Sequence, residues 1–284
     1  NCRTDEMLKN HTTFKVGGRC RYFLTPVTEE ELRLCMNIIY KNRIKYYIIG
    51  RGSNILADDG GYDGVIISTE RLNNYIKNSD VLLEAGCGVG LDAISDFAME
   101  KGLTGFEFAC GIPGSLGGAV VMNAGAYEGE ISQVLRRVKL LTAKGDIIWK
   151  DGKELELGYR KSNILANNEI VLAAELILKH GDIDTIRDEI EDLNGRRKQK
   201  QPLEYPSAGS TFKRPEGYFA GKLIDDAGLR GYRLGGAAVS TKHCGFVINY
   251  DNATSNDIKG LIRYVQSQVY EKFGVKLECE VRMI

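Results

Sequence analysis

The spacing of apolar residues predicts helices and strands that alternate along the chain. Leu, Ile, Met and Val recur at helical spacing in stretches that we expect to form helices: 28–42, 91–101, 182–198, 220–227 and 255–273. Shorter apolar runs between turn residues predict strands at 45–49, 65–68, 81–85, 134–142, 147–149, 170–179 and 246–249. Residues 275–283 alternate between apolar and charged side chains, which predicts a final strand. The mixture indicates an α+β protein.

Local signals place several boundaries between these elements. Thr28 and Glu31 have the spacing of a capping box at the start of the first helix, and Gly102 follows the second helix as a terminator. Residues 144–146 (Lys-Gly-Asp) are typical of a turn, so we expect the strands on either side to form a hairpin. Residues 201–215 hold three of the five prolines and indicate a domain boundary or an active-site loop.

The composition excludes several classes of function. The 284 residues carry 38 basic and 38 acidic side chains, which gives no support to binding of nucleic acid or of a membrane surface. No apolar run approaches the roughly 20 residues of a membrane span, and no secretory leader is visible. The seven cysteines lack CxxC spacing and the histidines lack metal-site spacing. We therefore expect free thiols in a reducing cytoplasm and no metal.

Gly86–Gly90 follows a predicted strand and precedes a helix, as in a Rossmann dinucleotide-binding unit. The sixth position of that fingerprint is Leu91 where glycine is needed, so we interpret this segment as a tight structural turn. The sequence also contains no GxxxxGK[ST] phosphate loop and no GxSxG elbow. Their absence argues against ATP chemistry and against a serine nucleophile of the hydrolase type.

Two other glycine-rich loops are better candidates for a dinucleotide site. In Gly50–Asn54, two glycines let backbone N–H groups approach a pyrophosphate, while Arg51 adds charge and Ser53 and Asn54 add neutral donors. In Gly111–Gly118, glycines leave a surface with little bulk for a planar ring. Either loop alone is also explained as a plain connection. Their occurrence together, followed by Asn123-Ala-Gly125, favours binding.

Six segments together resemble one protein family. They are His11–Gly18, Gly50–Leu56, Gly111–Ala119 with Asn123–Ala126, Tyr159–Ser162, Ala208–Lys213 and Leu277–Arg282, in the family's order along nearly the whole chain. The sequence is similar here to the UDP-N-acetylenolpyruvoylglucosamine reductases, the MurB family, within the vanillyl-alcohol-oxidase-like FAD-binding fold. Thr211–Arg214 and the short stretch before Ile170 resemble the second subtype, which lacks an inserted tyrosine loop. Cys279 departs from relatives that often carry proline there.

The resemblance implies an architecture and a reaction. It implies non-covalent FAD bound by residues 1–199, which form two α+β subdomains, with strand 275–284 returning to the site. Residues 200–274 would form a smaller α+β substrate-binding domain. The implied reaction is NADPH-dependent reduction of UDP-N-acetylglucosamine enolpyruvate to UDP-N-acetylmuramate, in cytoplasmic peptidoglycan precursor synthesis. With this UDP-sugar and NADPH as small-molecule partners, we expect no nucleic acid, no membrane and a monomer or weak oligomer.

Three catalytic residues are carried over by the resemblance. Hydride addition to a C=C bond that bears a carboxylate needs a cation for the carboxylate and an acid for the adjacent carbon. Arg160 is implied as the cation, because a guanidinium fork binds a carboxylate bidentately. Ser210 is implied as the acid, and Glu280 as the third member. Without the resemblance they would be a surface Arg after a turn, a loop Ser that caps the next turn, and an exposed Glu paired with Arg282.

Further residues are implied to bind the cofactor and the substrate. The cofactor-binding residues are Gly50, Arg51, Gly52, Ser53, Asn54, Gly111, Ile112, Pro113, Gly114, Ser115, Gly117, Gly118, Asn123, Ala124 and Gly125. The substrate-binding residues are Tyr159, Lys200, Arg214, Arg230 and His243. Their cations suit an anionic substrate, although a structural role explains His243 equally well. Since one set of dinucleotide loops is visible, NADPH is expected to visit the flavin face that the substrate later uses, which predicts ping-pong kinetics.

Two other functions share parts of this pattern. An oxidase of a sugar lactone or alcohol has the same fold, but such enzymes often attach flavin through a histidine that Gly50–Asn54 lacks. If the reduced protein reacts rapidly with oxygen and not with the enolpyruvyl substrate, it is such an oxidase. A nucleotide-sugar binder that has lost its flavin would stay colourless after addition of FAD.

We predict that the flavin is bound without a covalent link, because the first glycine-rich loop contains no histidine. Acid precipitation of the yellow protein should leave the colour in the supernatant. Colour that remains in the pellet would contradict this prediction.

Overall fold

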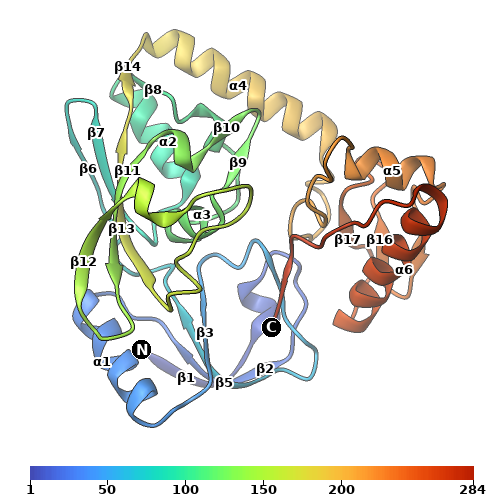
Figure 1. Cartoon of the computed structure of the whole chain (residues 1–284), viewed down its shortest axis with the longest axis horizontal. Helices are drawn as coiled ribbons and strands as arrows, with labels where there is room; N and C mark the ends of the chain where they lie inside the picture. Colours follow the sequence, from blue (N-terminus) through green and yellow to red (C-terminus); the bar gives the residue numbers. More distant parts are fainter. The chain divides into compact units, whose positions relative to one another are not determined.

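The computed structural model describes all residues, 1–284 (Figure 1). The chain forms two compact units. The first unit contains Asn1–Arg3, Phe23–Arg51 and Val65–Arg197. The second unit contains Thr4–Tyr22, Gly52–Gly64 and Lys198–Ile284. The backbone therefore passes from one unit to the other several times, and each unit is built from segments that are distant in sequence. The division predicted at residues 199 and 200 stays a prediction.

A five-stranded sheet forms the framework of the first unit, with strand order β12-β11-β13-β7-β6. Its strands are β6 (Ile76–Ser79), β7 (Leu82–Gly86), β11 (Leu135–Leu141), β12 (Ile147–Asp151) and β13 (Ile170–Ile177). All neighbouring pairs run antiparallel, and β11 with β12 forms the predicted hairpin. The central strand β13 is buried from Ile170 to Leu176, as expected of a strand covered on both faces.

The antiparallel sheet confirms that Gly86–Gly90 is not part of a Rossmann unit, because such a unit requires parallel strands. A Cβ atom on Gly86 would overlap the carbonyl oxygen of Asn73. At Gly88 it would lie 2.6 Å from the carbonyl oxygen of Glu70. These glycines are therefore required by the close approach of two backbone segments.

Four helices belong mainly to the first unit: α1 (Glu29–Lys41), α2 (Leu91–Glu100), α3 (Leu116–Met122) and α4 (Ile183–Lys200). Thr28 caps α1 by accepting a hydrogen bond from the Glu31 N–H at 3.2 Å. The Glu31 carboxylate accepts from the N–H of Val27 at 2.7 Å, one residue before the position that a capping box needs. The predicted cap is thus confirmed, and the predicted box is wrong by one donor.

Further strands of the chain lie outside the five-stranded sheet. They are β1 (Cys2–Met7), β2 (Arg19–Leu24), β3 (Tyr46–Ile49), β4 (Ile55–Leu56), β5 (Tyr62–Ser68), β8 (Leu103–Thr104), β9 (Gly125–Ala126), β10 (Gly129–Glu130) and β14 (Lys179–His180). β3 pairs in parallel with β5, while β8 pairs with β14 and β9 with β10 in antiparallel fashion. The predicted strand 170–179 is therefore divided into β13 and β14.

The second unit packs two helices and a small antiparallel sheet around its own core. Its elements are α5 (Ala220–Asp226), β15 (Arg233–Leu234), β16 (Ala237–Val239), β17 (Val247–Asn249), α6 (Ser255–Phe273) and β18 (Arg282–Met283). Thr254 and Asp257 form a capping box at the start of α6, and Gly274 ends the helix in the left-handed conformation. Ile258, Leu261 and Val265 face the core at helical spacing, as the sequence predicts.

The predicted final strand 275–283 is mostly wrong as a regular element. Leu277 and Val281 are buried as the alternation predicts, but Met283 is 46% exposed and only Arg282–Met283 forms a strand, β18. The segment changes partner along its length. Residues 278–280 bond to residues 211–213, and residues 282–284 bond to residues 54–56. Because no single neighbour runs beside it, no continuous ladder forms.

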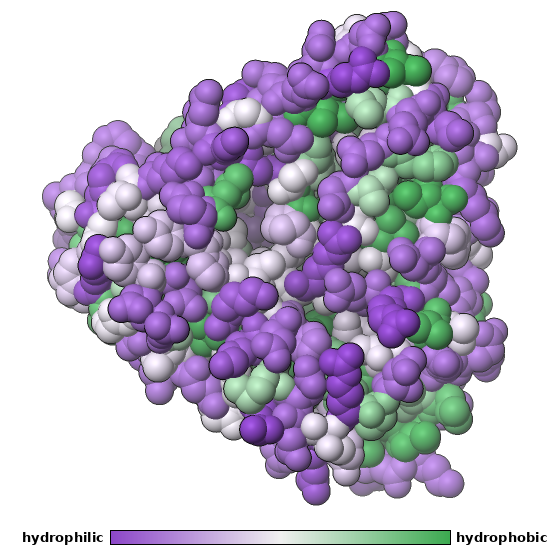
Figure 2. Space-filling view, turned by 180° about the vertical axis from the view of Figure 1, so that it is seen from behind, coloured by the Kyte–Doolittle hydropathy of each residue, from purple (hydrophilic) through white to green (hydrophobic).

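One face of the molecule and the helices show how apolar residues are distributed. Figure 2 shows that hydrophilic residues predominate on the face in view, with hydrophobic residues in small separate patches. Among the helices, not one combines the length and the apolar character that crossing a bilayer would demand.

Candidate active site

The two predicted glycine-rich loops meet in the first unit. Gly50 follows β3, and Ser115 stands at the N-terminus of α3. A Cβ atom on Gly50 would overlap the Ser115 hydroxyl, so the Ser115 side chain packs against the Gly50 backbone as closely as glycine allows. The turn before α2 lies beside them, because Gly90 forms a bridge with Ser115 and would overlap the Arg51 guanidinium if it carried a Cβ. A turn that we interpreted as structural thus also lines the candidate site.

Two buried polar atoms at this meeting point have no hydrogen-bond partner. Ser115 is 1% exposed, and its hydroxyl makes no hydrogen bond. The Nε of Arg51 is also buried and unpartnered, although its Nη1 donates to Asp92 at 3.1 Å. Buried polar groups are almost always paired in native proteins. These atoms fit a ligand that brings its own acceptors, such as a pyrophosphate or the polar edge of a flavin ring.

The first loop continues into the second unit at Gly52. Gly52 has φ of +64°, and a Cβ atom there would overlap the backbone of His11. Its carbonyl oxygen accepts from the Thr13 N–H at 3.2 Å, and the Thr13 hydroxyl is a further buried polar atom without a partner. Asn54 donates through its side-chain amide to the carbonyl oxygen of Glu280 at 3.1 Å. This half of the loop is therefore held by contacts to distant segments.

The second loop is shorter than predicted, because its latter part is the helix α3. Helix propensity disfavours consecutive glycines, but α3 packs on β13 and thereby gains stability from tertiary contacts. Gly118 lies on the exposed side of α3, where a Cβ atom would meet only the Ser115 hydroxyl at 3.8 Å. That open surface suits a flat ring. Gly111 has another reason to be glycine, since a Cβ atom there would overlap Arg197.

Arg160 is held in a tight turn of the first unit. The turn joins Gly158 and Lys161, which pair through two backbone hydrogen bonds, and Arg160 has φ of +55°. Its guanidinium donates to the carbonyl oxygens of Asn123 at 3.3 Å and Gly125 at 2.8 Å. The ring of Tyr159 lies 4.9 Å from the guanidinium carbon. Arg160 is thus a placed cation and differs from a surface Arg that merely follows a turn.

The Asn123–Gly125 segment supports Arg160 as well as being a predicted cofactor contact. Asn123 is 0% exposed and left-handed, with φ of +42°. Its side-chain amide donates to Gly158 at 3.1 Å, and its side-chain oxygen accepts from the N–H of Ser132 at 2.9 Å. Both side-chain atoms therefore bind protein groups. The role of Asn123 towards the cofactor stays a prediction.

Ser210 is exposed between residues that are firmly anchored. Gly209 precedes it with φ of +72°, and Thr211 follows it fully buried. The Thr211 N–H donates to Gly245 at 2.8 Å, and the Thr211 hydroxyl accepts from the N–H of Val247 at 2.9 Å. The next helix, α5, begins only at Ala220, so Ser210 does not cap it. Its hydroxyl is therefore presented on a loop that the buried Thr211 anchors.

Glu280 lies beside this loop in the same unit. Its N–H donates to the carbonyl oxygen of Thr211 at 2.8 Å, which places Glu280 one residue away from Ser210. Phe212 and Cys279 form a bridge, and the Lys213 N–H donates to Glu278 at 2.8 Å. The structure therefore brings Ser210 and Glu280 together although 70 positions separate them in the sequence. Arg160 belongs to the other unit, where its own contacts hold it.

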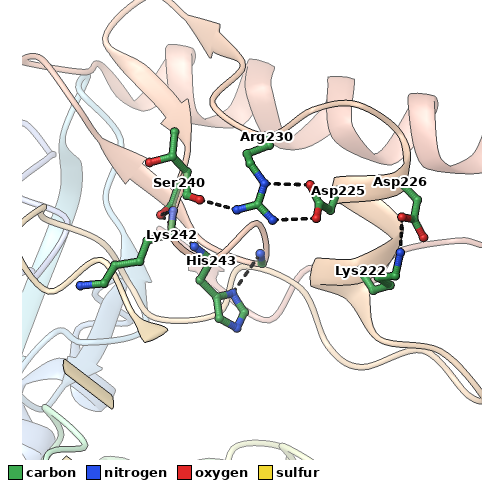
Figure 3. Close-up of polar contacts among 9 residues, drawn as sticks. Lys222, Asp225, Asp226, Arg230, Ser240, Lys242 and His243 are labelled. Carbon is green, nitrogen blue, oxygen red and sulfur yellow. Dashed lines mark hydrogen bonds and ion pairs between the residues drawn. The ribbon is translucent and has the colours of Figure 1, made fainter. Parts of the chain in front are cut away.

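Arg230 and His243 occupy one surface of the second unit (Figure 3). Arg230 binds Asp225 bidentately at 2.9 and 2.6 Å and also donates to the carbonyl oxygen of Thr241. The Arg230 guanidinium holds the pKa of the Asp225 carboxyl below its usual value. Burial, helped by the charge of Arg230, lowers the pKa of His243. Its Nδ1 accepts from the Gly245 N–H at 3.1 Å, so the neutral ring carries its proton on Nε2.

The remaining predicted substrate residues are exposed. Lys200 is the last residue of α4, and Arg214 stacks on Phe219 with 4.0 Å between the guanidinium carbon and the ring centre. Tyr159 is 48% exposed beside Arg160. Because Lys200 and Arg214 are exposed, they are accessible to an anionic ligand. Their contacts within the second unit do not indicate a particular role.

Comparisons with known proteins decide the family. Residues 20–151 match the family described as FAD binding domain, and residues 201–284 match UDP-N-acetylenolpyruvoylglucosamine reductase, C-terminal domain. A UDP-N-acetylenolpyruvoylglucosamine reductase of Clostridium botulinum (strain Eklund 17B / Type B) is 50% identical over 277 residues, which cover 98% of this chain and 91% of the relative. One of Clostridium novyi (strain NT) is 51% identical, covering 98% and 90%. The chain belongs to the UDP-N-acetylenolpyruvoylglucosamine reductase family.

A solved structure supports the same conclusion for this reductase. The enzyme of Thermus caldophilus, MurB, has a TM-score of 0.85 and 34% identity, and the alignment covers 100% of this chain and 99% of that one. BBE-like 1 variant D396N of Physcomitrella patens, with a TM-score of 0.50 and 16% identity, covers 63% of this chain and 42% of that one, which shows the fold alone. The predicted family, the vanillyl-alcohol-oxidase-like fold and the FAD cofactor are confirmed. The chain is an FAD-dependent oxidoreductase.

Sequence reasoning missed several residues that shape the site of this reductase. Asp92 accepts a hydrogen bond from Arg51, and Gly90 leaves room for the Arg51 guanidinium. Thr13 carries an unpartnered hydroxyl next to Gly52. The signal for Gly90 is the glycine-rich turn 86–90, which we interpret from the sequence as structural. Thr13 stood inside a segment that matched the family but was given no role. For Asp92 no sequence signal existed, since acidic residues are common in the first turn of a helix.

We predict that Ser115→Ala weakens FAD binding about five- to tenfold without destabilising the protein free of FAD, because the hydroxyl has no partner until a ligand supplies one. Titration of the flavin-free protein with FAD measures the affinity, and thermal unfolding without FAD measures the stability. Ser95→Ala is the matched control, since Ser95 in α2 is another buried serine with an unpartnered hydroxyl. Equal loss of FAD affinity in both variants would refute the assignment of Ser115.

Proposed function

We propose that this chain reduces UDP-N-acetylglucosamine enolpyruvate to UDP-N-acetylmuramate in the cytoplasm, with NADPH as the source of electrons. The observation that carries the proposal is the anchored loop that presents the exposed Ser210 beside Glu280. An acid held next to a carboxylate, in a family of flavin reductases, suits protonation of a substrate carbon. The product is a peptidoglycan precursor, so the enzyme would serve cell-wall biogenesis, cell shape and cell division.

Arg160 would bind the carboxylate of the enolpyruvyl group. FAD, when bound between the glycine-rich loops, supplies the hydride for the terminal carbon of the C=C bond. Negative charge then builds on the adjacent carbon and spreads into the carboxylate. The Arg160 fork would stabilise that charge by two parallel hydrogen bonds, because a guanidinium stays protonated and matches a carboxylate in shape. Its own contacts to Asn123 and Gly125 orient it for this task.

Ser210 would donate the proton that completes the reaction. A hydroxyl is a weak acid, but a carbon that carries enolate charge is basic enough to take its proton. The balance is one hydride to the terminal carbon and one proton to its neighbour. Glu280 stands beside the loop and is the next candidate for the acid. The rigid neighbours Thr211 and Phe212 keep the hydroxyl from relaxing away from the substrate.

The exposed cations would recognise the diphosphate and sugar of the substrate. Lys200 and Arg214 would offer positive charge to the anionic substrate, and Arg230 would do so beside its partner Asp225. Neutral His243 would donate one hydrogen bond through Nε2, and its lowered pKa keeps it in that form at neutral pH. Residues 200–274 would form the substrate-binding domain, residues 1–199 with 275–284 the FAD-binding domain, and the enzyme would be a monomer or weak oligomer.

NADPH would reduce the flavin before the substrate arrives, at the same face. The chain holds one pair of glycine-rich loops of the required kind, so the two ligands would alternate. Such alternation separates the reaction into two half-reactions that are measured independently through flavin absorbance. It also allows each residue to be assigned to one half.

We predict that Arg160→Lys slows reoxidation of the reduced flavin by the enolpyruvyl substrate at least about tenfold, because a point ammonium cannot form the bidentate fork. Reduction by NADPH should change little. Arg187→Lys, which alters an exposed ion pair with Asp184 in the same unit, is the control. Turnover of the Arg160 variant at the wild-type rate would remove Arg160 from the site.

We predict that Ser210→Ala is bleached normally by NADPH but reoxidised by the substrate about 10²–10⁴-fold more slowly, the usual loss when a positioned acid is removed. Ser210→Cys should recover part of the rate, because a thiol also donates a proton. Stopped-flow absorbance of the flavin separates the halves, and Ser267→Ala removes another exposed hydroxyl of the unit as a control.

The possible outcomes separate three roles for Ser210. If Ser210→Ala slows both halves equally, Ser210 is structural and holds the loop. If it slows neither half, another group donates the proton, and Glu280→Gln is the next variant to measure.

A further inference from the structure

Backbone strain is concentrated around Arg160. Four residues of the first unit that are not glycine adopt positive φ in its immediate support: Asn123 at +42°, Tyr127 at +51°, Glu128 at +70° and Arg160 itself at +55°. The left-handed conformation costs free energy for residues with a Cβ atom, and it persists only where the surroundings enforce it. Such clusters occur where a structure has to hold a functional group in one place.

Tyr127 and Glu128 form the loop of a minimal hairpin. The hairpin pairs β9 with β10 in antiparallel register, with Ala126 opposite Gly129. A two-residue loop in which both residues have positive φ is normally built from Asn, Asp or Gly. Here it contains an aromatic residue and a Glu. The sequence therefore disfavours this turn locally, and contacts outside the hairpin must stabilise it.

Tyr127 supplies those contacts by fastening the hairpin to α4. Its hydroxyl donates to the carbonyl oxygen of Leu193 at 3.2 Å. Its ring lies 5.0 Å from the guanidinium carbon of Arg196 and 5.6 Å from that of Arg197. Arg197 is 5% exposed and donates to the carbonyl oxygen of Cys110. The tyrosine is thus held at its hydroxyl and packed against two guanidinium groups.

Phe108 and Gln133 contact the hairpin at other points. A Cβ atom on Gly129 would overlap the ring of Phe108, so the backbone rests directly on that side chain. Gln133 donates to the carbonyl oxygen of Glu128 at 3.1 Å. The first residue of β9 is Gly125, whose carbonyl oxygen accepts a hydrogen bond from Arg160 at 2.8 Å. A movement of the hairpin away from α4 therefore moves an oxygen that orients the guanidinium.

We infer that Tyr127 is a positioning residue for the reduction step and acts on Arg160 through β9. The inference rests on the proposed role of Arg160 towards the enolpyruvyl carboxylate. Tyr127 needs no contact with the substrate for this role. The Tyr127 hydroxyl fixes the strained turn to α4, the turn fixes β9, and the Gly125 carbonyl oxygen fixes the guanidinium fork. Small misplacements of a binding group lower reaction rates disproportionately.

Tyr127→Phe tests this role, because it removes only the hydrogen bond to Leu193 and keeps the ring between the guanidinium groups. We expect reoxidation by the enolpyruvyl substrate to slow about three- to tenfold, with a raised KM for that substrate, and reduction by NADPH to remain within about twofold of wild type. Tyr40→Phe is the control, since it removes the hydroxyl that pairs with Tyr46 at 3.3 Å in the same unit.

A double-mutant cycle with Arg160→Lys shows whether the effect passes through Arg160. If it does, Tyr127→Phe has little further effect in the Arg160→Lys background, because the fork it positions is already lost. Additive effects, or equal slowing of both half-reactions by Tyr127→Phe, overturn the inference. If Arg160→Lys is slow but Tyr127→Phe behaves like wild type, the inference about Tyr127 is overturned and the proposed role of Arg160 is not. Wild-type behaviour of Arg160→Lys overturns the proposed function of Arg160 instead.

Discussion

The hydrogen bonding of the C-terminal segment to two separate loops is the constraint on which much of the site depends. Residues 278–280 bond to residues 211–213, and residues 282–284 bond to residues 54–56. Buried backbone groups have to be paired, so this segment fixes both loops at once. One loop presents Ser210, and the other contains Asn54 of the first glycine-rich motif. The C-terminal segment thereby joins the candidate acid to the first glycine-rich loop within the second unit.

Close packing of polar side chains against glycines plays the corresponding part in the first unit. The Ser115 hydroxyl lies so close to Gly50 that a Cβ atom on Gly50 would overlap it. The Arg51 guanidinium lies equally close to Gly90. The result is a pair of buried polar atoms that lack protein partners. Such atoms destabilise the protein when it is empty and gain hydrogen bonds when a ligand binds. FAD binding and folding stability of this reductase are therefore expected to be coupled, since a ligand stabilises the state that it binds.

Arg160 and Arg230 show two ways in which the fold places a cation. Arg230 is paired bidentately with Asp225 on an exposed surface, where an ion pair contributes little to stability. Arg160 is held by the carbonyl oxygens of Asn123 and Gly125, in a region where several residues adopt an unfavourable backbone conformation. Local sequence preference is overridden there by tertiary contacts, which is typical of functional sites.

The sequence by itself determined the family and the elements with strong periodicity, and it proposed the reacting residues. Helix α6 and the β11–β12 hairpin follow from apolar spacing, caps and turn residues, all of which act within a few positions. Only the tertiary structure decided that 275–283 is largely not a strand, that α3 forms across two glycines, and that Gly90 lies beside Arg51 and Ser115 of the two glycine-rich loops. These features depend on which distant backbone segments pair and how closely they pack, and no local pattern of side chains encodes those contacts.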